Sequence, residues 1–148
     1  MNDRPQNAKE NFEKGYNCTQ AVVLAYAKEM GLDDETVLKI ASSFGGGMGK
    51  LREVCGAVSG MFMVAGMLKG YTDITDPEAK KLHYQLVRKM GEKFKNENGS
   101  IVCKELLGLK KPETDSNPQE RTPEYYKKRP CAQLVYCAAQ IIEEEFNL

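Results

Sequence analysis

Cysteine is the residue type in this sequence that most directly offers chemistry. The 148-residue chain contains five cysteines, at positions 18, 55, 103, 131 and 137. Their number is odd, and no pair has the C-x-x-C spacing. Small secreted proteins held together by disulfides usually have a denser, even-numbered set. We therefore expect thiols in a reducing compartment, available for packing, redox chemistry or metal binding.

Three of the cysteines lie at or near expected helix starts. Cys131 directly follows Pro130, and Cys103 follows Ser100, which can cap a short helix. Cys55 lies within about one turn of the start of another expected helix. Unpaired N–H groups and the helix dipole favour an anion at such positions, which lowers the pKa of a thiol. Nearby positive charges add to this effect, and they come from Lys50, Arg52, Lys104, Lys128 and Arg129.

These positions predict that the thiolates of Cys55, Cys103 and Cys131 carry redox chemistry, with Cys18 as a fourth partner. In a dithiol version, one thiolate attacks and a neighbouring cysteine resolves the product as a disulfide. Cys18 is expected in the middle of a helix, and Cys137 is rotated away from Cys131 on the last helix.

Two other interpretations of the cysteines remain open. Free cysteine is often buried and packs as a small hydrophobic residue. A metal ion or an iron–sulfur cluster would instead be held by Cys18, Cys55, Cys103 and Cys131. The close ligand pairs of structural zinc sites and the common spacings of iron–sulfur sites are absent, which is weak evidence against a metal.

A glycine-rich stretch, FGGGMGKLREVCGAVSG at residues 44–60, surrounds Cys55. It fits neither phosphate-binding motif, because Phe44 and Leu51 break the P-loop pattern and Lys50 breaks G-x-G-x-x-G. Glycine also permits positive φ and lets a neighbouring helix or a bound group come close. Tight helix packing and a ligand site are therefore the two alternatives. The candidate cofactor-contacting residues are Gly45, Gly46, Gly47, Gly49, Gly56 and Gly60.

Helical periodicity dominates the chain, and we find no convincing alternating strand. Helices are expected at about residues 4–30, 33–44, 51–69, 76–94, 100–107 and from 130 onward. The polar, proline-containing segment 108–129 is expected to be a loop, and loops of this length in a compact domain are often functional. The prediction is one all-α domain over residues 1–148, a bundle of about five or six helices with a long polar loop before the last one.

His83, the only histidine, lies near the apolar edge of the expected helix 76–94. This position is more typical of a packing residue than of a catalytic base, which would have to approach a cysteine in space. Tyr125 and Tyr126 in the long loop could cover a site or simply anchor the loop.

Charge and hydropathy restrict the classes of function. Lys plus Arg number 21 and Asp plus Glu number 21, so the net charge is zero and nothing draws the chain to nucleic acid or an anionic membrane. The N-terminus lacks the apolar segment of a secretory signal. The longest uncharged run, residues 54–68, is shorter than the roughly 20 residues that a membrane helix needs. We therefore expect a cytoplasmic protein without membrane insertion.

The order of the cysteines resembles a known family. Cys18, the GGGMG segment and CGAVSG from Cys55 to Gly60, and then Cys103 and Cys131 are similar to the four separated cysteines and C-G-A-x-x-G motif of the C_GCAxxG_C_C redox-active family. The likeness covers the chain from about residue 12 to residue 144, and Cys137 falls outside it. The resemblance implies a small, mostly helical protein with a redox role and a prosthetic group such as an iron–sulfur cluster.

Two functions follow as hypotheses. The first is a redox-active protein that uses the four patterned cysteines, together with a redox partner protein. The second is a non-catalytic helical module in which the cysteines pack and the glycine face binds a small ligand or a second subunit, giving a homo-oligomer.

Overall fold

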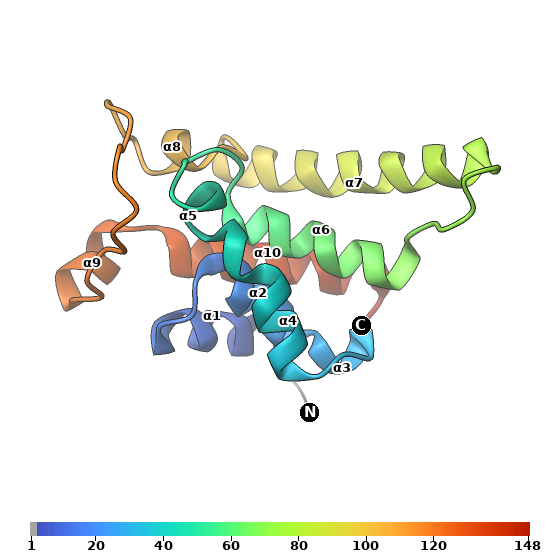
Figure 1. The fold of residues 1–148 in the computed structure, drawn as a ribbon, viewed down its shortest axis with the longest axis horizontal. Coiled ribbons are helices and arrows are strands. Elements are labelled where there is room, and N and C mark those ends of the chain that lie inside the picture. The colour runs from blue at the N-terminus through green and yellow to red at the C-terminus, as the bar shows by residue number, and fades with distance from the viewer. Residues whose placement is uncertain (1–2) are drawn as a thin grey trace.

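The computed structural model describes residues 3–148, which form helices joined by loops and contain no strand (Figure 1). The all-α prediction is therefore confirmed. None of the helices in this part of the chain combines the length and the apolar content that crossing a membrane requires. The helices are α1 Arg4–Lys14, α2 Cys18–Ala25, α3 Ala27–Met30, α4 Asp34–Ala41, α5 Gly45–Met48, α6 Gly56–Lys69, α7 Pro77–Asn98, α8 Cys103–Leu106, α9 Pro123–Lys128 and α10 Cys131–Phe146, with a 3₁₀ turn at Ser42–Phe44.

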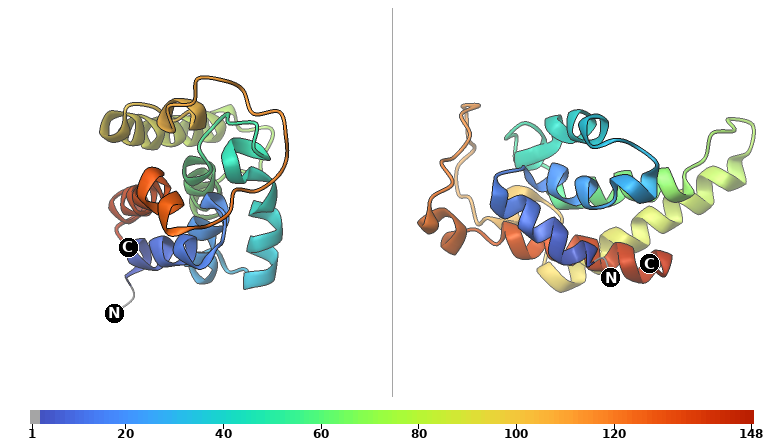
Figure 2. Two further views of the ribbon diagram at one scale, coloured as in Figure 1. Left: turned by 90° about the vertical axis from the view of Figure 1, so that its left-hand side faces the viewer. Right: turned by 90° about the horizontal axis from the view of Figure 1, so that it is seen from below.

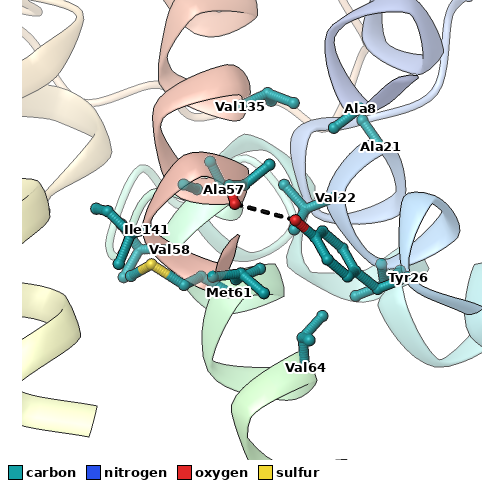
Figure 3. Packing of buried hydrophobic residues seen from close by; sticks show 14 of the residues in the cluster. Ala8, Ala21, Val22, Tyr26, Ala57, Val58, Met61, Val64, Val135 and Ile141 are labelled. Atoms are coloured by element: carbon teal, nitrogen blue, oxygen red, sulfur yellow. Dashed lines mark hydrogen bonds between the residues drawn. The ribbon is translucent and has the colours of Figure 1, made fainter. Parts of the chain in front are cut away.

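The helices α2, α6 and α10 form the centre of the bundle. Each packs on the other two, α1 covers α2 and α10, and α7 lies along α6 and α10 (Figures 1 and 2). Figure 3 shows apolar side chains from these helices, including Val22, Met61 and Val135, gathered near Tyr26. The Tyr26 hydroxyl is buried there and donates to the carbonyl oxygen of Ala139 at 3.0 Å, which satisfies it inside the core.

The expected helix 4–30 is broken into three, and this moves Cys18. Gly15 has a φ of +119° and ends α1, while the Asn17 side chain caps α2 by accepting from the backbone N–H of Gln20 at 2.8 Å. The Gln20 side chain accepts from the N–H of Asn17 in return. The prediction of a mid-helix Cys18 is therefore wrong, because the thiol lies on the first residue of α2.

Residues 51–55, where the sequence predicted the first turn of the helix 51–69, are not helical, and a short backbone pairing forms there instead. Val54 and Val102 form an isolated antiparallel bridge, and the Cys55 N–H donates to the carbonyl oxygen of Ile101 at 2.8 Å. The Cys103 N–H donates to the Glu53 carbonyl at 2.6 Å. The helix expected at residues 51–69 therefore begins only at Gly56, as α6. The pairing holds Cys55 and Cys103 beside each other.

The glycine-rich segment forms a left-handed turn. Five consecutive residues from Gly46 to Lys50 have positive φ, between 58° and 72°, so α5 is not an ordinary right-handed helix. A residue with a Cβ is destabilised there by roughly 1–2 kcal/mol. Three of the five are glycines, whereas Met48 and Lys50 bear the strain.

The expected loop 108–129 contains one helix. The Thr122 hydroxyl accepts from the N–H of Tyr125 at 3.1 Å, and Pro123 occupies the first turn, so α9 begins there. The rest of the segment, the 108–122 loop, runs from α8 to α9 along one edge of the molecule (Figure 1).

Candidate functional site: a cavity lined by four cysteines

Four of the five cysteines line one cavity of about 380 Å³. They are Cys18, Cys55, Cys103 and Cys131, which come from the starts of α2, α6, α8 and α10. The cavity wall is completed by α1, the glycine-rich segment and the 108–122 loop. The structure therefore brings together cysteines that are separated by up to 113 positions in the sequence.

Close packing between α2 and α6 places Cys18 next to the start of α6. The buried Thr19 hydroxyl donates to the carbonyl oxygen of Gly56 at 2.8 Å. A Cβ at Gly56 would lie 2.8 Å from the Thr19 hydroxyl and 2.9 Å from the Cys18 Cβ. Only glycine fits at this position without moving a neighbour. Gly56 therefore allows the start of α2, which carries Cys18, to pack closely on the start of α6, next to Cys55.

The thiols of Cys18 and Cys131 have pKa values that are shifted in opposite directions. A hydrogen bond joins their side chains, and it holds the pKa of the Cys131 thiol below its ordinary value while raising that of Cys18 well above. The positive charges of Arg129, Arg121 and Arg52 also lower the Cys131 pKa. The arrangement favours a Cys131 thiolate that accepts a hydrogen bond from a protonated Cys18.

The other two cavity cysteines differ from the prediction that helix starts lower their pKa. Burial raises the pKa of Cys55 to about 12, although the N–H groups of Ala57 and Val58 favour its thiolate. Burial also raises the pKa of Cys103, against the opposing effect of Arg52, whose Nη1 lies 3.6 Å from its Sγ. At both positions desolvation raises the pKa by more than the helix N-terminus and nearby charge lower it. These two thiols therefore remain protonated near neutral pH.

Two arginines beside Cys131 have no carboxylate partner in residues 3–148. The Arg121 guanidinium donates to the carbonyl oxygens of Phe12 at 2.9 Å and Tyr16 at 3.1 Å, and it stacks on the Phe12 ring at 4.2 Å. Arg129 lies 5.7 Å from the centre of the Tyr125 ring. Within the part of the chain that the structure describes, neither guanidinium forms an ion pair, so no carboxylate there offsets either charge near the Cys131 sulfur.

Ion pairs fasten the 108–122 loop to the strained glycine-rich segment. Lys50 Nζ lies 2.8 Å from Asp115 and 3.2 Å from Glu113, and Arg52 Nε lies 3.2 Å from Glu113. These cations keep the pKa of both carboxyl groups low. Like Lys50, Arg52 has a positive φ, +61°. The contacts help to offset the left-handed strain at these two residues and hold the loop over the cavity.

The candidate glycines divide into two groups. Five of them line the cavity, namely Gly45, Gly46, Gly47, Gly49 and Gly56. Gly60 lies outside the lining and packs on α2, where an added Cβ would lie 3.0 Å from the Val22 Cβ. The glycine face of α6 therefore serves helix packing at Gly60 and the cavity at Gly56.

His83 and Cys137 are both outside the cavity. His83 lies near the start of α7, with its ring centroid 6.0 Å from that of Tyr71. The Cys137 thiol donates to Glu97 Oε2 at 2.9 Å, and burial and this carboxylate raise its pKa to about 11. Neither residue contributes a group to the four-cysteine arrangement.

The arrangement of side chains does not suit a single metal ion. In residues 3–148, no group of three or more His, Cys, Asp or Glu side chains is placed to hold one. The four cavity thiols nevertheless have the donor chemistry of an iron–sulfur cluster, which uses several irons and four separate thiolates.

Sequence reasoning did not identify Arg121 or Asn17 as site residues. Arg121 reaches the cavity from the 108–122 loop, and the carbonyl to which it donates, that of Phe12 in α1, is 109 positions away. No local sequence pattern could therefore predict that Arg121 lies at the site. Asn17 lines the cavity and caps α2. Here a signal existed, because Gly15, Asn17 and Gln20 have the spacing of a helix stop followed by a capping box.

The fold and the cavity define a small all-helical protein with four clustered thiols. A family model described as "Putative redox-active protein (C_GCAxxG_C_C)" matches residues 16–145. The chain belongs to this family, which confirms the resemblance inferred from the sequence. Searches of curated proteins and of solved structures found no match.

Proposed function

We propose that the protein carries out thiol–disulfide exchange, with Cys131 as the attacking thiolate and Cys18 as the resolving thiol. The observation that carries the proposal is the placement of both thiols in one cavity that Arg52 and Arg121 also line. There, hydrogen bonding between the two side chains and the nearby arginines favour the thiolate of Cys131 and the protonated form of Cys18. The redox character of the family supports the same conclusion.

The proposed exchange has two balanced steps. The Cys131 thiolate attacks one sulfur of a substrate disulfide, forms a mixed disulfide and expels the other half as a thiolate. Cys18 then loses its proton to that thiolate and attacks the Cys131 sulfur, which forms the Cys18–Cys131 disulfide and expels the second half. The substrate gains two electrons and the cysteine pair loses two. A dithiol donor returns the pair to the reduced state by the reverse exchange.

The pH dependence of Cys131 reactivity tests this assignment. Only the thiolate reacts with iodoacetamide, so a lowered pKa moves the rise in alkylation rate to lower pH. We expect Cys131 to reach half its maximal rate below pH 8.5, the ordinary value for cysteine, and before the other four thiols. Mass spectrometry of the Cys131 peptide after timed alkylation measures the profile.

Two substitutions at position 18 provide the control. Cys18→Ala removes the hydrogen-bond donor and should move the Cys131 profile to higher pH. Cys18→Ser keeps a donor and should leave the profile closer to that of the unmodified chain. A Cys131 profile at or above pH 8.5, or one that ignores both substitutions, would contradict the proposed roles.

The four thiols around one cavity favour a second candidate, an electron-transfer site with an iron–sulfur cluster held by Cys18, Cys55, Cys103 and Cys131. Such a cluster would supply one-electron chemistry. Iron and acid-labile sulfide analysis of anaerobically purified protein separates the candidates. Thiol exchange predicts neither in stoichiometric amount and five thiols that react with a thiol reagent after unfolding; stoichiometric iron and sulfide would favour the cluster instead.

A further inference from the structure

We infer that the cysteine cavity selects small, negatively charged disulfides as its substrates. This inference rests on the proposed thiol exchange and adds to it the size and the charge of the molecule that enters.

The charge lining the cavity has one sign. Lys50, Arg52 and Arg121 are lining residues, whereas no Asp or Glu of residues 3–148 is among them. Glu113 and Asp115 pair with Lys50 and Arg52 from outside the lining. Arg121 has no carboxylate partner in the same part of the chain, and neither has Arg129 nearby. A cavity with an excess of cations and without lining carboxylates concentrates anions.

The single negative charge of a Cys131 thiolate does not neutralise all of this positive charge. One thiolate faces Arg121, Arg129 and Arg52, which all lower its pKa. Arg52 is shared with Glu113, so two guanidinium groups remain for a single negative sulfur. When the thiolate becomes part of a mixed disulfide its charge leaves with the expelled half, and an anionic group on the substrate can balance the arginines in its place.

The dimensions of the cavity favour a small molecule over a protein disulfide. A volume of about 380 Å³ lies near the lower end of the range for small-ligand sites. Cys131 is only 8% exposed, so a disulfide must enter the cavity to meet its sulfur. Gly49, Ser116 and Gln119 line the cavity and are exposed, so the cavity meets solvent at these residues.

Three disulfides of similar size but different charge test the inference on the intact chain. They are dithiodiglycolate, bis(2-hydroxyethyl) disulfide and cystamine, which are anionic, neutral and cationic. The rate at which each oxidises the reduced protein is divided by its rate with a neutral reference thiol, because leaving-group pKa alone changes exchange rates. We expect the normalised rate to be at least about tenfold higher for the anion than for the cation, and this ratio to shrink as salt is added.

A charge substitution at the cavity mouth tests the location of the effect. Gln119→Glu adds a negative charge at an exposed lining residue and should reduce the anion-to-cation ratio about threefold or more. Gln85→Glu makes the same change on an exposed residue of α7 that does not line the cavity, and should leave the ratio unchanged.

The outcomes of these experiments distinguish a failure of the anion preference from a failure of the proposed thiol exchange. Equal normalised rates for the three probes, or equal effects of the two glutamate substitutions, would overturn the anion preference while thiol exchange stands. The arginines would then serve only the Cys131 thiolate. If no probe produces a disulfide between Cys18 and Cys131, the proposed exchange itself is lost.

Discussion

Cys131→Ser is expected to slow the reduction of a small disulfide by on the order of a thousandfold, because a serine hydroxyl is not ionised near neutral pH and is a far weaker nucleophile than a thiolate. Cys18→Ser should behave differently. Its first step remains, so the mixed disulfide on Cys131 should accumulate because no resolving thiol follows. Intact-mass spectrometry after mixing reduced protein with the disulfide distinguishes the two variants.

Cys137→Ser is the matched control for these two substitutions. Cys137 is a cysteine of the same chain, but it lies outside the cavity and bonds to Glu97 and Asn98. We expect its replacement to leave the rate of disulfide reduction unchanged. If Cys131→Ser and Cys137→Ser retained equal activity, Cys131 would not be the attacking residue.

Gly47→Ala is expected to reduce the free energy of unfolding by about 2–4 kcal/mol, through crowding and backbone strain together. An added Cβ would lie 2.7 Å from the Arg52 Cα, 2.7 Å from the Cys103 Cβ and 2.8 Å from the Glu53 nitrogen. Two of these atoms belong to the backbone and cannot easily move aside. The φ of +66° at Gly47 adds left-handed strain. Urea unfolding followed by circular dichroism measures the loss.

Gly46→Ala separates crowding from strain. Gly46 has nearly the same φ, +68°, but the nearest atom to an added Cβ is the Lys50 Cβ at 3.6 Å, an ordinary contact. We expect a loss of only about 1–2 kcal/mol from the left-handed strain. Equal losses for the two variants would show that close approach to Cys103 does not require Gly47.

Local signals in the sequence were enough for the helix that carries Cys131. Pro130 precedes an apolar stripe of helical period, and the structure starts α10 at Cys131. Cys18 was misplaced because the apolar stripe continues on both sides of Gly15 and Asn17. In the structure those two residues end one helix and cap the next. The same kind of local signal, Thr122 followed by Pro123, starts α9.

The environment of the thiols depends on contacts that no sequence pattern predicts. The helix-start argument was insufficient for Cys55 and Cys103, because their burial is set by chain segments from elsewhere and raises their pKa. Arg121 acts on Cys131 only because the 108–122 loop returns to α1. The GGGMG segment indicated positive φ, but the continuation of left-handed geometry through Met48 and Lys50 depends on packing and on the ion pairs of the loop.

The most direct test of the account is to identify the first disulfide that the reduced protein forms. Reduced chain is mixed with one equivalent of a small disulfide, free thiols are alkylated at once, and the linked peptides are mapped by mass spectrometry. We expect a bond between Cys18 and Cys131, with Cys55, Cys103 and Cys137 alkylated. A first disulfide between Cys55 and Cys103, or one that includes Cys137, would contradict it.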